Sequence, residues 1–119
     1  MEDFNIIEFR DKFIEDATEL LVTLEVDLLD LEKDMKNKEL IENVFRVMHT
    51  LKGTASMYGF DKVTEYTHSL ENIYDAIRSN DFSLSQDIFD VTFQSVDHLR
   101  KLLQDVEFWI LKTKSSILF

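Results

Sequence analysis

The chain has 119 residues, 45% of them apolar, and it contains ten phenylalanines but neither proline nor cysteine. This length suits one domain with a modest core, and without cysteine there is no disulfide framework, thiolate nucleophile or cysteine metal site. The formal net charge of -11 argues against binding to nucleic acid or to an anionic membrane, because both carry negative charge.

Acidic residues occur throughout residues 1–20, which argues against a signal peptide. No apolar run approaches the length that a membrane crossing needs. We therefore expect a cytoplasmic protein without membrane insertion, organised as a single domain over residues 1–119.

The first helix is expected over residues 6–36, because apolar residues recur there at steps of three or four. They are Phe9, Phe13, Ala17, Leu20, Leu24, Leu28, Leu31 and Met35. The polar connection that follows, residues 36–38, is short, and a short connection favours an antiparallel neighbour.

The second helix is expected over residues 39–58. Its apolar face comprises Ile41, Val44, Met48, Leu51, Ala55 and Tyr58. At about 100° per residue, His49 projects roughly 135° away from the centre of that face, and Lys52, Gly53 and Ser56 lie on the same side as His49. Gly59 is placed to end the helix in a left-handed conformation, with Phe60 packing back on the last turn.

A third helix is expected over residues 61–79, with an apolar stripe and an opposite polar stripe. The apolar stripe is Val63, Tyr66, Leu70, Ile73 and Ile77, and the polar stripe is Thr64, His68, Glu71 and Asp75. A fourth helix over residues 84–104 is expected to open with a capping box, Ser83-x-x-Gln86. We expect a break near Asp105 and a short fifth helical segment over residues 106–112. The fold class is therefore all-α, an antiparallel up-and-down four-helix bundle with this short C-terminal addition.

The exposed face around His49 has the composition of a reactive site. A glycine inside a helix costs roughly 1 kcal/mol relative to alanine, so Gly53 requires a reason. A glycine one turn from a histidine lets a bulky partner approach the imidazole without meeting a side chain. Lys52 adds a mobile positive charge, which suits a phosphoryl group.

The pattern His49-x-x-Lys52-Gly53-x-x-x-x-x-Gly59-Phe60 resembles the signature of histidine-containing phosphotransfer (HPt) domains. More narrowly, it is similar to the N-terminal phosphotransfer domain of CheA-type chemotaxis kinases. Residues 44–48 resemble that family's lead-in to the histidine, residues 67–72 its next helix and residues 13–21 its first. The resemblance extends over about residues 6–105.

The resemblance implies that His49 accepts a phosphoryl group. It also implies that Glu71 accepts a hydrogen bond from Nδ1-H of the imidazole, so that Nε2 attacks phosphorus, and that His68 is a second polar residue near the site. Lys52 would neutralise phosphoryl oxygens during transfer. Gly53 and Ser56 would leave the surface open to the partner.

The chain contains no glycine-rich phosphate loop and no acidic magnesium motif, so we expect no cofactor within it. A histidine kinase catalytic domain would use ATP to supply the phosphoryl group, and a response-regulator receiver domain with its own magnesium would accept it on an aspartate. We expect the isolated domain to be a monomer. A free-standing HPt relay protein outside chemotaxis is the alternative to a CheA-type domain.

Two other function classes remain open. A carboxylate–histidine metal centre in a bundle needs Glu-x-x-His pairs on two helices, whereas this chain offers only the reversed pair His68-x-x-Glu71. A non-catalytic helical adaptor would explain the bundle and its acidity, but not a mid-helix glycine beside Lys52 and His49.

Overall fold

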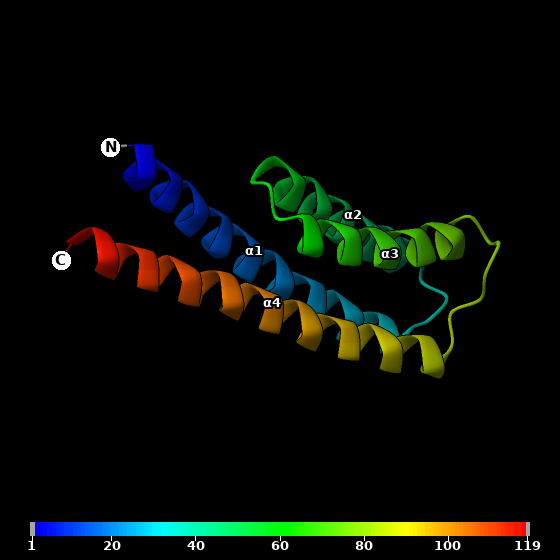
Figure 1. Cartoon of the computed structure of the whole chain (residues 1–119). Helices are drawn as coiled ribbons and strands as arrows, with labels where there is room; N and C mark the ends of the chain where they lie inside the picture. Colours follow the sequence, from blue (N-terminus) through cyan, green and yellow to red (C-terminus); the bar gives the residue numbers. More distant parts are fainter. Residues whose placement is uncertain (1, 119) are drawn as a thin grey trace.

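The computed structural model describes residues 2–118 and consists there of four helices joined by short connections. They are α1 (Glu2–Lys33), α2 (Lys38–Met57), α3 (Asp61–Arg78) and α4 (Gln86–Leu118). The helices alternate in direction, α1 packs on α2 and α4, and α3 packs on the same two (Figure 1). The N-terminal end of α1 and the C-terminal end of α4 extend past the turn that joins α2 to α3 (Figure 1). The prediction of an antiparallel four-helix bundle is confirmed.

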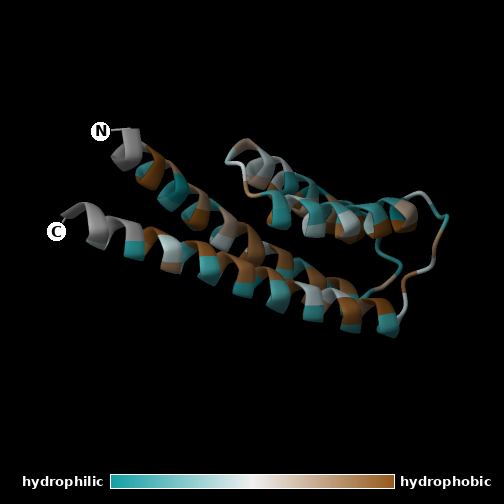
Figure 2. Cartoon of the chain, viewed as in Figure 1, coloured by the Kyte–Doolittle hydropathy of each residue, from teal (hydrophilic) through white to brown (hydrophobic). Residues whose placement is uncertain are grey.

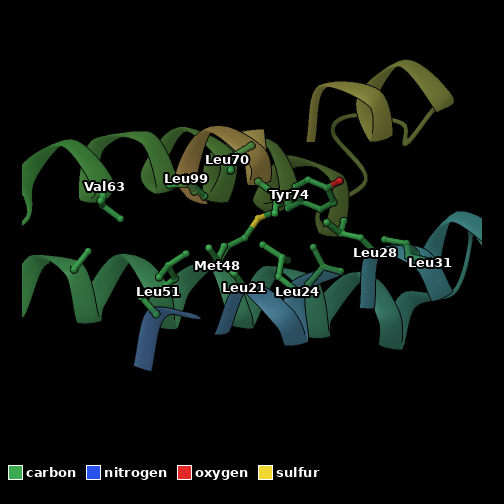
Figure 3. Packing of buried hydrophobic residues seen from close by; sticks show 14 of the residues in the cluster. Leu21, Leu24, Leu28, Leu31, Met48, Leu51, Val63, Leu70, Tyr74 and Leu99 are labelled. Atoms are coloured by element: carbon green, nitrogen blue, oxygen red, sulfur yellow. The ribbon is translucent and has the colours of Figure 1, made fainter. Parts of the chain in front are cut away.

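The core lies along the axis of the bundle, where each helix turns its apolar stripe inward (Figure 2). Figure 3 shows leucines of α1 meeting Met48 and Leu51 of α2, Leu70 and Tyr74 of α3 and Leu99 of α4. Burial of such stripes, at about 25 cal/mol per Å² of apolar surface, is the main stabilising contribution to a bundle. None of the helices among residues 2–118 combines the length and the apolarity that a membrane crossing requires.

Helix α2, which carries His49, is fixed at both ends by its own sequence. At the start, the Asn37 side chain accepts a hydrogen bond from the Leu40 amide at 3.1 Å, which satisfies one of the free amides of the first turn. At the end, Gly59 adopts φ 81°, and the Phe60 amide donates to the Ala55 carbonyl at 2.9 Å. This is a Schellman ending, and it confirms the left-handed role expected of Gly59.

We expect the Gly59→Ala variant to unfold more easily by roughly 1–2 kcal/mol, because a Cβ is disfavoured in the left-handed region. Apart from its two chain neighbours, no residue has an atom within 4 Å of the position that this Cβ would take, so the cost would come from the backbone and not from a clash. Thermal melts of parent and variant measure it. An unchanged melting temperature would contradict this account of the turn.

The helix boundaries differ from the expected ones mainly in α4. This helix begins at Gln86, and its cap is Ser85, whose hydroxyl accepts a hydrogen bond from the Ile88 amide at 3.4 Å. The prediction of a capping box that starts at Ser83 was therefore wrong. The predicted break near Asp105 and the separate fifth segment were also wrong, because α4 continues to Leu118. Residues 86–118 contain no proline or glycine to interrupt the helix, and its extension buries Ile110 to 1% exposure.

The other three predicted helices are shifted by a few residues: α1 starts at Glu2 and ends at Lys33, while α2 and α3 each end one residue early. The buried face of α1 also differs from the predicted apolar face, because Phe9 is exposed and Leu21, not Leu20, is fully buried. Helix ends are the least sharply specified part of a periodic pattern.

Tyr74 is the largest fully buried side chain, although the predicted stripe of α3 omits it. The Thr92 hydroxyl donates to the Ile88 carbonyl at 2.7 Å, so its oxygen is left to accept the Tyr74 hydroxyl proton at 2.9 Å. Burial raises the pKa of Tyr74 to about 12. A tyrosine can occupy a core because a partner satisfies its hydroxyl, and here that partner comes from α4.

Candidate functional site

His49 lies on the surface of α2, on the side facing away from the core. Its side chain is 64% exposed, while Met48 and Leu51 on the same helix are fully buried. The apolar face of α2 fixes the rotation of the helix, so the imidazole is directed outward. A partner protein could therefore reach the ring directly.

Glu71 of α3 binds two side chains of α2, those of His49 and Lys52. Its carboxylate accepts a hydrogen bond from His49 Nδ1 on Oε2 and one from Lys52 Nζ on Oε1, both at 2.8 Å. Glu71 is only 7% exposed, and a buried carboxylate is stable only when it is paired. The structure thus brings together three residues that are predicted for the site, from two helices.

Glu71 remains ionised in this setting. Burial acts to raise the pKa of Glu71, but the hydrogen bonds from Lys52 and His49 and the positive charge of Lys52 outweigh burial and lower it. The carboxylate is therefore an acceptor only.

The protonation of the imidazole follows from the charge of its partner. Because the Glu71 carboxylate can only accept, Nδ1 of His49 carries the proton in the neutral ring. The lone pair is then on Nε2, on the opposite side of the ring. This is the tautomer that a nucleophilic Nε2 requires.

Gly53 and Ser56 are both exposed on α2, one and two turns after His49. Only Gly59 among the glycines has a positive φ, so Gly53 has ordinary helical geometry, and beyond its chain neighbours and the adjacent backbone of α2 no atom lies within 4 Å of the Cβ it would gain. Nothing in the fold thus requires a glycine at position 53. That supports a role in surface access.

The Gly53→Ala variant should be neutral or more stable by about 0.4–1 kcal/mol, because alanine is the better helix former. Gly53→Gln should fold equally well but raise the KM for the kinase domain, because the longer side chain obstructs the approach to His49. Melts and transfer rates on both variants separate stability from access. Normal transfer by Gly53→Gln would show that access does not explain the glycine.

The remaining histidines lie apart from this cluster. His68 is exposed on α3, one turn before Glu71, and within the described chain it forms no hydrogen bond or ion pair, so its place in the site stays a prediction. His98 of α4 packs on the Tyr66 ring with centroids 4.6 Å apart. No group of three or more histidine, aspartate or glutamate side chains that could hold a metal ion occurs among the described residues.

One neighbour of the imidazole, Phe45, and the residue that lies over it, Arg78, were not predicted for the site. Phe45, one turn before His49, packs beside the ring, and Arg78 of α3 lies over Phe45. The spacing of Phe45 and His49 could have indicated their contact. The approach of Arg78 depends on how α2 and α3 are rotated against each other, which periodicity does not specify.

The comparisons with known proteins agree with this geometry. The chemotaxis protein CheA of Listeria monocytogenes is 38% identical over 97 residues, which is 82% of this chain and 16% of that protein. The chain therefore spans about one sixth of the length of such curated relatives.

Two solved structures share the fold. The CheA phosphotransferase domain from Thermotoga maritima matches with a TM-score of 0.81 and 35% identity, covering 84% of this chain and 95% of that one. The phosphorylated P1 domain of CheA3, solved in complex with CheY6 from R. sphaeroides, matches with a TM-score of 0.76 and 21% identity, covering 94% and 97%. At that identity the second match shows likeness of fold alone.

The family model of the Hpt domain matches residues 8–109, which include all four helices in whole or in part and every residue of the cluster around His49. The chain therefore belongs to the Hpt domain family.

Proposed function

We propose that this chain is a phosphoryl carrier of the CheA type in which Nε2 of His49 is the reactive atom. The observation that carries the proposal is the pairing of an exposed imidazole with a buried, ionised glutamate through Nδ1. This pairing fixes a nucleophilic lone pair on the accessible nitrogen.

The first step is a phosphoryl transfer from ATP bound to a histidine kinase catalytic domain. Nε2 of His49 forms a bond to the γ-phosphorus, the bond to the bridging oxygen breaks, and ADP leaves. Nδ1 keeps its proton and donates it in the hydrogen bond to the ionised Glu71 carboxylate, which stabilises the positive charge that develops on the ring. ATP and magnesium belong to the partner domain, and none is required by this chain.

The second step transfers the group to an aspartate of a receiver domain. The carboxylate oxygen attacks phosphorus, the N–P bond breaks, and His49 returns to the neutral form. The complex of a phosphorylated P1 domain with CheY6 supports a receiver of this kind as the acceptor. The likeness to CheA supports chemotaxis signalling in the cytoplasm as the setting.

Lys52 is placed to assist both steps. Its Nζ lies 2.8 Å from Glu71 Oε1, and its side chain is 25% exposed, so it stands beside the imidazole at the surface. A lysine is a flexible point charge, and a small rotation would bring the ammonium to the phosphoryl oxygens. His68, one turn before Glu71, would line the same approach as a further polar residue.

A transfer assay with purified components tests the proposal. The chain is mixed with radiolabelled ATP and a CheA catalytic domain that lacks its own phosphotransfer domain. We expect label on the chain that is stable in base and labile in acid, as phosphohistidine is, and loss of this label on addition of a receiver domain. Without the kinase domain no label should appear. Failure to accept label from a kinase that phosphorylates its own P1 domain would contradict the proposal.

A further inference from the structure

Phe45 borders the imidazole along α2, one turn before His49. The two rings are nearly parallel, with an angle of 21° between their planes and 6.1 Å between their centroids. This separation lies in the range of offset aromatic contacts. Phe45 is half-buried, so one part of its ring belongs to the edge of the core and another part faces the site.

The Phe45 ring is itself held by a cation from α3. The guanidinium carbon of Arg78 lies 3.8 Å from the ring centroid, well inside the range of a cation–π contact. Arg78 is oriented by a hydrogen bond from Nε to Asp75 Oδ1 at 2.7 Å and by Nη1, which is 3.4 Å from Glu42 Oε1. Exposed ion pairs of this kind contribute little to stability, but here they orient a planar group over an aromatic ring.

One hydrogen bond does not define the orientation of an exposed ring. The contact with Glu71 fixes the position of Nδ1, yet the imidazole can still tilt about that atom, because its side chain is 64% exposed. A second contact, from a ring nearly parallel to the imidazole, restricts this freedom. Phe45 supplies that contact, and Arg78 prevents the Phe45 ring from turning away.

We infer that Phe45, held by Arg78, is a positioning residue for His49. It restricts the imidazole so that Nδ1 stays on Glu71 while Nε2 points at the incoming phosphorus. The consequence for transfer rests on the proposed phosphoryl-carrier function, whereas the effect on the imidazole itself does not. A misaligned nucleophile slows the chemical step more than it weakens binding.

Three variants test this role. Phe45→Leu keeps an apolar side chain but removes the ring, Phe45→Tyr keeps the ring, and Arg78→Lys keeps the charge but removes the planar group over it. Uptake of phosphoryl from the kinase domain gives kcat and KM. Nitrogen-15 NMR of labelled histidine reports the tautomer and the mobility of the His49 ring without any kinase.

We expect Phe45→Leu to lower kcat about tenfold with KM within about twofold of the parent, since misalignment acts on the reacting geometry. Its NMR signals should show a more mobile His49 ring with the proton still on Nδ1, because Glu71 continues to accept a hydrogen bond from that atom. Phe45→Tyr should retain the parent values, and Arg78→Lys should move both readouts in the direction of Phe45→Leu. Thermal melts confirm that each variant is folded under the assay conditions.

Parent-like kcat and ring signals in Phe45→Leu would overturn the inference, as would a loss that Phe45→Tyr shares in full. A loss of rate with an unchanged His49 ring would also overturn it, because the effect would then come from the docking surface. If the parent itself accepted no phosphoryl group, the proposed function would fall, and the NMR result alone would decide whether Phe45 positions the ring.

Discussion

The His49→Gln variant is expected to fold like the parent and to take up no phosphoryl group. Glutamine has no nucleophilic nitrogen, so the transfer step has no acceptor. The side chain at this position is 64% exposed, and substitutions at exposed positions usually change stability by less than about 0.5 kcal/mol. Labelled ATP with a kinase domain measures uptake, and a thermal melt measures folding.

The chain offers two matched controls for this variant. His68→Gln and His98→Gln make the same change at exposed histidines outside the hydrogen-bonded cluster. His98→Gln should incorporate label at the parent rate, and His68→Gln should still be phosphorylated, with at most a slower rate. Acid-labile label on His49→Gln at the parent level would refute the assignment of the site.

The Glu71→Ala variant should have the second largest effect, a loss of roughly 10² in the rate of phosphorylation. Orienting and proton-holding groups typically contribute factors of about 10² to 10⁴ to the reaction rate. At an exposed imidazole we expect the loss of rate to lie at the low end of this range. Removing the carboxylate frees both Nδ1 of His49 and Nζ of Lys52, so the tautomer and the nearby cation lose their anchor together.

Glu65→Ala is the matched control, because Glu65 is an exposed carboxylate of the same helix outside the cluster. Single-turnover kinetics on both variants separate the chemical step from binding. We expect Glu65→Ala to transfer at the parent rate. If Glu71→Ala did so as well, Glu71 would have no part in the mechanism.

The effect of pH on the stability of the fold follows from the pairing of Glu71 with His49 and Lys52. The pKa of Glu71 is lowered in the folded protein, so its contribution to stability is present above the ordinary pKa of a glutamate. This contribution is lost as the pH falls through the lowered value.

The general architecture could be predicted because the apolar residues repeat with helical period in four separate segments. The stripe of α2 matched the structure at Ile41, Val44, Met48, Leu51 and Ala55, all of which are buried. The rotation of this helix is therefore defined by its own sequence, and with it the outward direction of His49. The ending at Gly59 was also predictable, because a glycine there has a specific backbone reason.

Other features depend on contacts between helices, which no local pattern contains. Glu71 is separated from His49 by 22 positions, and only the family resemblance related the two. The burial of Tyr74 depends on Thr92 of α4. The continuation of α4 past Asp105 buries Ile110 and places the Trp109 ring under the Arg10 guanidinium of α1, while Phe108 and Leu111 stay largely exposed.

The atom that carries the phosphoryl group is the most direct test of the account. Nitrogen-15 NMR of histidine-labelled protein, phosphorylated by the kinase domain, distinguishes phosphorus on Nε2 from phosphorus on Nδ1 in each histidine. The account predicts phosphorus on Nε2 of His49, with the proton retained on Nδ1 and donated in a hydrogen bond to Glu71. Phosphorus on Nδ1 of His49, or on His68 or His98, would contradict it.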